Sequence, residues 1–191
     1  MFKLFACLIA SLTTVLMASS SAFAEKLPGN IAVHIAKTHY EHPVRLLHPY
    51  LDVWHIKGPL VEKAALKTLE KRFANLNLCN SSKGADVVLL LEPHMYYNPQ
   101  LRVFHGEIIA RAFTNGTEPI LTIKKQAQQN GDLGIKPDFY MEKAYTKAMD
   151  KVIKKLETDK VFLATLNTIQ KNNAETLCAA LDDLPVAKIY Y

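Results

Sequence analysis

The histidines of this chain are the side chains whose type and spacing most directly suggest chemistry. All seven lie between positions 34 and 105, and three fall within the eleven residues HYEHPVRLLHP at 39–49. Zinc and copper are held by three or four converging ligands, usually including two that are close in sequence. His39 and His42 form such a pair, and they predict a zinc or copper site if His55 or another strand histidine converges with them.

An ordinary structural role is the alternative for the same histidines. His42 and His48 each precede a proline, which disfavours a helical conformation of the histidine. The pair His39 and His42 is therefore expected in an irregular segment rather than on one face of a helix. Without a third converging histidine, from His55, His94 or His105, the segment 39–49 is predicted to be a connection between strands.

A carboxylate and two tyrosines form a second group of candidate binding residues. Glu92 ends the apolar run ADVVLLLEP, and a carboxylate at the end of a buried strand must be hydrated, paired or functional. The segment HMYYNPQ follows, and Tyr96 and Tyr97 beside Pro99 are candidate contacts to a partner or ligand. Packing of these tyrosines against the core is the alternative.

Recognisable catalytic motifs do not occur in the sequence. It contains no G-x-S-x-G, H-E-x-x-H, phosphate-binding loop or G-x-G-x-x-G pattern, and its acids show no pairing typical of glycosidases. We therefore expect a protein that is not an enzyme, with no catalytic residue and no cofactor. A metal-binding protein that uses His39, His42 and His55 for zinc or copper is the second hypothesis, and an unrecognised secreted hydrolase is the third.

The first 24 residues, MFKLFACLIASLTTVLMASSSAFA, have the pattern of a cleaved signal peptide. Lys3 precedes an apolar run, and Ala22-Phe23-Ala24 provides the small residues that signal peptidase requires, so we expect cleavage before Glu25. The apolar run is too short for a membrane span of about 20 residues, and Cys7 lies too close to the N-terminus to be a lipidation site. The prediction is a periplasmic or secreted protein, soluble and without a transmembrane segment after cleavage, with 25–191 forming a single domain.

The charge of the chain argues against nucleic-acid binding. Its net charge is +5, which becomes +4 when Lys3 is removed, and its lysines alternate with acidic residues in stretches such as KAALKTLEKR. A nucleic-acid interface would instead show clustered basic residues with stacking aromatics. Weak attraction to anionic components of the cell envelope remains compatible with this charge.

Two cysteines, Cys79 and Cys178, remain after cleavage of the signal peptide. An even number of cysteines in an exported protein predicts a disulfide. The bridge would close a loop of about 100 residues and stabilise the fold by about 4 to 5 kcal/mol in the chain-entropy model.

Apolar periodicity predicts the order of the structural elements. Strands are expected at 31–36 and 51–57, a helix at 59–77, and a buried strand at 85–93. A hairpin of strands 101–113 and 118–128 follows, with a bulge at Gly106, and then a helix over 137–156 and shorter helices near the C-terminus. The tail VAKIYY is a candidate edge strand. This order predicts an α+β fold, in which a mixed sheet of four to five strands carries its helices mainly on one face.

The elements between residues 58 and 157 resemble a small module of bacterial envelope proteins. The helix at 59–77, the strand ADVVLLLE, the hairpin and the helix YTKAMDKVIKKL are similar in order to the amino-terminal domain of TolB, the curli-secretion lipoproteins and the activators of peptidoglycan synthases. This resemblance implies a periplasmic binding or assembly module without catalysis. The function predicted first is therefore an exported, soluble, non-catalytic binding or assembly protein of the bacterial cell envelope, whose partner is an envelope protein or a cell-wall component.

Overall fold

A five-stranded mixed sheet organises the molecule, as seen in a computed structural model that describes residues 26–79, 84–166 and 174–182. The strand order is β4 (Phe73–Leu78), β1 (Leu27–His34), β5 (Val87–Asn98), β6 (Val103–Phe113) and β7 (Leu121–Asn130). β1 runs parallel to both β4 and β5, whereas β5, β6 and β7 are antiparallel. The α+β fold with a mixed sheet is confirmed. The signal peptide and the tail VAKIYY lie outside the described residues.

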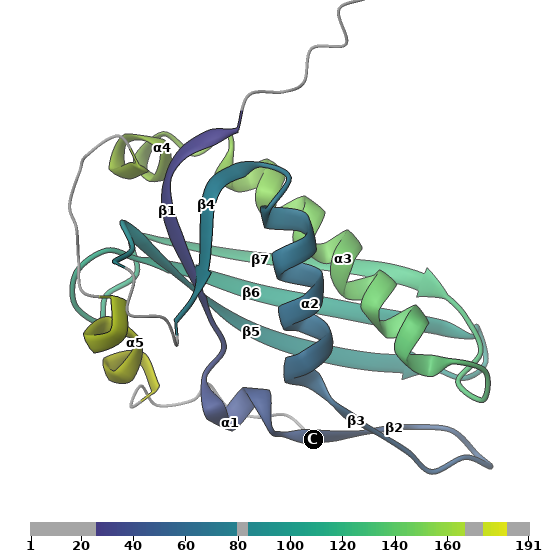
Figure 1. Cartoon of the computed structure of the whole chain (residues 1–191). Helices are drawn as coiled ribbons and strands as arrows, with labels where there is room; N and C mark the ends of the chain where they lie inside the picture. The colour runs from purple at the N-terminus through teal and green to yellow at the C-terminus, as the bar shows by residue number, and fades with distance from the viewer. Residues whose placement is uncertain (1–25, 80–83, 167–173, 183–191) are drawn as a thin grey trace, which may run out of the picture.

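Two long helices cover one face of the sheet, which we call the helix-covered face. α2 (Lys57–Leu69) and α3 (Pro137–Leu156) lie side by side across the strands in Figure 1. α3 forms because Met141, Ala144, Ala148 and Val152 recur with a helical period, and all four are buried. No helix in the described part of the chain is long and apolar enough to cross a membrane.

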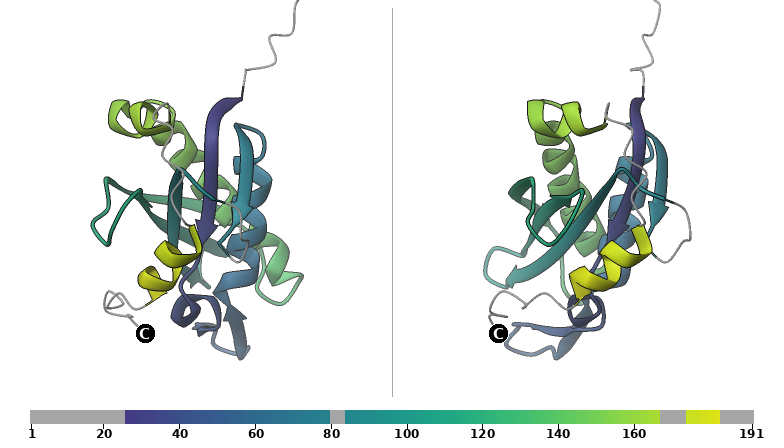
Figure 2. Two further views of the ribbon diagram at one scale, coloured as in Figure 1. Left: turned by 60° about the vertical axis from the view of Figure 1, so that its left-hand side comes forward. Right: turned by 90° about the vertical axis from the view of Figure 1, so that its left-hand side faces the viewer.

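The strand β5 sends alternate side chains to the two faces of the sheet. Leu89 and Leu91 belong to the large core beneath α2 and α3, whereas Val88 and Leu90 belong to a smaller cluster on what we call the opposite face. The helix α5 (Ala174–Asp182) covers part of that opposite face, as Figure 2 shows, and α4 (Lys160–Leu166) lies near β1. The uninterrupted apolar run of β5 therefore reflects burial on both sides.

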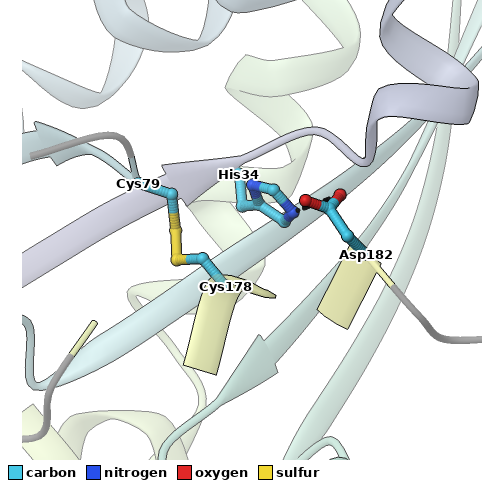
Figure 3. The surroundings of a disulfide bond; sticks show 4 residues. All are labelled: His34, Cys79, Cys178 and Asp182. Atoms are coloured by element: carbon cyan, nitrogen blue, oxygen red, sulfur yellow. Dashed lines mark hydrogen bonds and ion pairs between the residues drawn. A yellow bond between two sulfur atoms is a disulfide. The ribbon is translucent and has the colours of Figure 1, made fainter. Parts of the chain in front are cut away.

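A disulfide fixes α5 to the sheet. Cys178 of α5 is bonded to Cys79, which directly follows β4, and their Cα atoms are 6.0 Å apart (Figure 3). Nearby, Asp182 accepts a hydrogen bond from the backbone N–H of Lys37 and lies 3.1 Å from His34 Nε2. The structure thus joins the two cysteines that remain after the predicted signal cleavage.

The helix predicted at 59–77 is wrong in its C-terminal part. The observed helix ends at Leu69, and Phe73–Leu78 forms the edge strand β4, parallel to β1. Leu69, Phe73 and Leu76 are three or four residues apart and therefore mimic a helical stripe. The alternation in FANLNL, with apolar side chains at every second residue, is the signal for a strand.

Two further differences concern the strands β5 and β6. β5 continues through Pro93 to Asn98, although the buried strand was predicted to end at residue 93. Proline is tolerated there because β1 pairs only with Val87–Leu90, so in the described part of the chain no strand pairs with that side of β5 beyond Leu90. Gly106 keeps a regular register with both neighbours, and no bulge occurs. A Cβ atom at Gly106 would lie 3.0 Å from the backbone carbon of Ala144, so this glycine allows α3 to approach the sheet.

The segment predicted to be irregular contains two short elements. α1 (Lys37–Tyr40) is a single helical turn, and β2 (Pro43–Leu46) pairs antiparallel with β3 (Val53–Ile56) in a separate two-stranded sheet. The hairpin β2–β3 extends from the body of the molecule in Figure 1, below the ends of β5 and β6.

Candidate functional site

The hairpin β2–β3 has one buried and one exposed face. Leu46 and His55 are buried against the body of the protein. On the other side, Arg45 pairs across the strands with Trp54, and both are turned to solvent. A strand alternates its side chains between two faces, so the sequence LDVWHIK places Val53 and His55 inward and Trp54 outward.

Four large apolar side chains of the hairpin are exposed, and we call them the hairpin surface. Tyr50 at the turn is 92% exposed and Trp54 is 58% exposed, although aromatic side chains of this size usually bury much of their area. The other members are Leu47 at the turn and Ile56 at the end of β3. Clustered exposed apolar residues of this kind indicate an interaction surface.

A second exposed apolar group lies at the neighbouring end of the five-stranded sheet. This strand-end patch consists of Leu101 between β5 and β6, Ile135 before α3, and Phe139 in the first turn of α3. The loop before α3 approaches the hairpin, since a Cβ atom at Gly134 would lie 3.4 Å from Leu51 Cδ1. In Figure 1 the hairpin turn and the start of α3 occupy the same end of the molecule. Exposed apolar area in the described residues is thus concentrated at one end.

The hairpin is attached to the core by close contacts at its base. Tyr40 of α1 packs against Gly58 so closely that a Cβ atom there would lie 2.4 Å from the tyrosine ring. His55 is buried beside Tyr145 of α3, with a hydroxyl-to-Nε2 distance of 3.5 Å. Burial, followed by the positive charge of Lys57, lowers the pKa of His55 to about 4, so this histidine is neutral at pH 7.

Glu92 is the centre of a polar cluster on the opposite face. It is 3% exposed, and its carboxylate accepts a hydrogen bond from His94 Nε2 at 3.1 Å and another from the Arg111 guanidinium at 2.8 Å. The hydrogen bond from His94, and then that from Arg111, lower the pKa of Glu92 to about 2 despite its burial. The carboxylate is therefore ionised at neutral pH and is paired with both of these side chains.

His39 and Lys57 extend this polar cluster toward the base of the hairpin. Both are almost fully buried, and the rings of His39 and His94 lie edge to face with centroids 6.4 Å apart. Burial, then the charge of Lys57, lowers the pKa of His39 to about 4, and burial lowers the pKa of Lys57. His39 Nδ1 has no hydrogen-bond partner among the residues that the structure describes. Burial and the nearby charge of Lys57 therefore favour the neutral form of His39.

The three histidines predicted to bind metal do not come together as ligands. Among the described residues, donor atoms within 4.8 Å of one another are found for His34, Cys79 and Cys178, a group that excludes His39, His42 and His55. Both sulfur atoms of that group belong to the disulfide, so they are not available as thiolate ligands. The convergence on which the metal hypothesis depended is therefore not observed.

The two candidate tyrosines have different environments. Tyr96 is 52% exposed and lies near the ring of His105. Tyr97 follows the alternative and is buried against Phe104, because consecutive residues of the extended β5 point to opposite faces. Neither lines the cavity of about 440 Å³ beside β4, whose walls include Asn30, Asn75 and Asp86.

The sequence interpretation did not identify the hairpin surface as a site. The signal was present, because Trp54 and Ile56 alternate with Val53 and His55. A short alternating strand does not show which of its faces packs on the core, and both faces of β3 carry large side chains. Burial in the folded structure decides that Trp54 and Ile56 are the exposed pair.

Comparisons with known proteins find similar solved structures but no matching family model or curated protein. Among solved structures, a Xanthomonas campestris protein of family DUF330 matches with 10% identity and a TM-score of 0.47 over 67% of this chain and 83% of that one. A Caulobacter crescentus protein described as a lipoprotein matches with 15% identity and a TM-score of 0.36 over 56% of this chain and 83% of that one. Both similar structures come from bacteria, and the resemblance to TolB and related modules remains a prediction.

Proposed function

We propose that this chain is an exported, non-catalytic binding or assembly protein of the bacterial cell envelope, and that it attaches to its partner through the hairpin surface. The export signal at 1–24 and the disulfide between Cys79 and Cys178 support an extracytoplasmic location, because structural disulfides persist in oxidising compartments. The non-catalytic part of the proposal rests on the sequence, which contains none of the catalytic motifs named above.

The exposure of the hairpin surface is the observation that carries this proposal. A soluble domain gains free energy by burying Leu, Ile and Trp, at about 25 cal/mol for each Å² of apolar area removed from water. The inner face of the same hairpin is buried, so the chain had an apolar core available to it. Side chains that remain exposed at the turn and outer face, clustered with the strand-end patch, are typical of a surface that is covered by a partner.

Retention of the protein on the cell envelope tests this proposal. The full chain, with its own signal peptide, is produced in a bacterium, and the fraction that sediments with total envelope material is measured. The variant Trp54→Ser/Ile56→Ser removes half of the hairpin surface without touching the buried face. Val161→Ser is the matched control, because Val161 is as exposed as Trp54 but lies on α4.

We expect the wild type and Val161→Ser to be retained and the double variant to be released into the soluble fraction. Urea unfolding of the purified variants verifies that all three share one fold, since exposed substitutions change stability by less than about 0.5 kcal/mol. Equal retention of all three proteins would contradict a role of the hairpin surface, and no retention of any of them would contradict envelope binding.

A further inference from the structure

The shape of the hairpin surface restricts the kind of partner that fits it. Leu47 and Tyr50 lie in the turn of a two-stranded hairpin that projects from the molecule in Figure 1, and in both views of Figure 2 the hairpin occupies an extremity of the protein. A protruding apolar turn can be buried in two ways. Its partner either has a deep groove of matching shape or is deformable enough to accept the inserted side chains. The interfacial region of a lipid bilayer yields to inserted side chains and needs no matched groove.

The residue types of this surface are those that favour a membrane interface. Trp and Tyr have an apolar ring and a polar N–H or O–H group, and they concentrate at the level of the lipid headgroups. The hairpin carries both, Tyr50 at the turn and Trp54 on the outer face, together with Leu47 and Ile56 as purely apolar side chains.

Basic residues accompany the apolar residues of the strand-end patch. Arg102 follows Leu101 and Lys136 follows Ile135, and all four are exposed. Lys143 Nζ lies 4.2 Å from the centre of the Phe139 ring, which is the third residue of the patch. Lys and Arg can lay their methylene stems along an apolar layer while their charges reach headgroup phosphates. Arg102 is paired with Asp132 at 3.7 Å, whereas neither Lys136 nor Lys143 is paired with an acidic residue in the described part of the chain. Together with the net charge of +4 that is expected after removal of Lys3, these basic residues are complementary to an anionic lipid surface.

We propose that the hairpin surface and the strand-end patch bind the surface of an anionic phospholipid bilayer, with Tyr50 and Trp54 at headgroup level and Leu47 inserted below them. This inference rests on the proposed function, because it names the partner of the same surface. The contact between Leu51 and the loop at Gly134 places the two apolar groups next to each other, so that one bilayer surface can receive both.

The fluorescence of Trp54 tests this proposal directly, because it is the only tryptophan of the chain. Purified protein is mixed with vesicles of phosphatidylcholine alone or with about one quarter phosphatidylglycerol. On the anionic vesicles we expect a blue shift of the emission, quenching by brominated acyl chains, and co-sedimentation that weakens as salt is added. Binding to phosphatidylcholine alone should be weaker by at least about tenfold, since the attraction of Arg102, Lys136 and Lys143 to anionic headgroups is absent.

Two variants separate insertion of the turn from a general charge effect. Leu47→Ser/Tyr50→Ser removes both turn residues but keeps Trp54 as the reporter, and its affinity for the anionic vesicles should fall at least about tenfold. Val161→Ser should bind as the wild type does. Unchanged affinity of the turn variant would overturn the proposal, as would equal binding to both kinds of vesicle.

The vesicle result and the envelope-retention result can fail independently. Absence of binding to either vesicle, with envelope retention that still depends on Trp54 and Ile56, would overturn the bilayer as partner and indicate a protein or cell-wall partner for the hairpin surface. Absence of both vesicle binding and envelope retention would overturn the proposed function as well.

Discussion

The two faces of the five-stranded sheet are held together by different interactions. On the helix-covered face, α2 and α3 bury a continuous apolar core that includes Leu91, Phe104 and Tyr145. On the opposite face, a smaller apolar cluster around Leu90 depends on α5, and the paired carboxylate of Glu92 lies next to it along the strand.

The two faces should respond differently to a substitution that removes a contact. The helix-covered face is stabilised by two long helices that contact the sheet and each other. Its packing energy is therefore distributed over many side chains. The opposite face depends on a nine-residue helix, α5, that is bonded to Cys79 through a disulfide spanning 99 residues. Loss of a contact on the opposite face should therefore loosen mainly α5. Loss of a contact on the helix-covered face should destabilise the whole fold.

Removal of the disulfide has the largest expected effect. The variant Cys79→Ser/Cys178→Ser should lose about 4 kcal/mol of unfolding free energy, because the bridge closes a long loop in the unfolded chain. Amide exchange should accelerate most in α5, whereas exchange in α2 and α3 should accelerate by no more than the loss of global stability requires. Reduced wild-type protein is the control and should behave like the variant. Equal acceleration in all helices would show that the two faces are not independent.

Adjacent leucines of β5 provide a second test of the difference between the two faces of the sheet. Leu91→Ala creates a cavity beneath α2 and α3 and should cost about 4 kcal/mol, whereas Leu90→Ala beneath α5 should cost about 2 kcal/mol, because α5 can move to fill the space. Urea unfolding of both variants measures the difference. Similar losses would mean that α5 packs as rigidly as the two long helices do.

The same contrast explains what the sequence could and could not predict. α3 and the buried part of β5 were predicted because their patterns are local, a stripe with helical period and an uninterrupted apolar run. β4 was missed because the spacing of Leu69, Phe73 and Leu76 also fits a helix, and its strand pairing with β1 is a long-range interaction. Pairing with neighbours, which no local pattern contains, decided its conformation.

For the candidate residues too, local patterns were predicted from the sequence and long-range contacts were not. The pairing of Cys79 with Cys178 was predicted, because only two cysteines remain after the predicted signal cleavage. For Glu92, pairing was one of three options that the sequence left open. Its partners were unknown because Arg111 comes from another strand, β6, and the buried strand was predicted to end before His94. The separation of His39, His42 and His55 also depends on tertiary placement, since a sequence spacing gives no distance across a fold.

Acidification should weaken both faces through buried histidines. His39 contacts the polar cluster and His55 contacts Tyr145, and both have native-state pKa values near 4 compared with 6.5 in the unfolded chain. The unfolded state therefore binds protons first as the pH falls, so stability is lost between about pH 6.5 and pH 4. Each histidine should account for about 3 kcal/mol of this loss.

Unfolding curves measured from pH 7 to pH 4 check this expectation. His39→Gln and His55→Gln should each flatten the pH dependence in that interval. Glu92→Gln should leave the interval largely unchanged, because the pKa of Glu92 is lowered to about 2 and its contribution is lost only below about pH 4.5. An unaltered pH dependence in both histidine variants would contradict their burial as neutral groups.

The close approach of α3 to β6 gives the smallest expected effect and probes the helix-covered face alone. In Gly106→Ala the new Cβ would lie 3.0 Å from the Ala144 backbone carbon and 3.1 Å from its Cβ, so α3 must shift by a few tenths of an ångström. The packing penalty of 1 to 3 kcal/mol exceeds the entropic gain from replacing glycine, and a net loss of about 1 kcal/mol follows. Thr122→Ala, at an exposed position on β7, should change stability by less than about 0.5 kcal/mol. A stabilised Gly106→Ala protein, measured by urea unfolding, would show that α3 is free to move away from the sheet and that the helix-covered face is less rigid than its packing indicates.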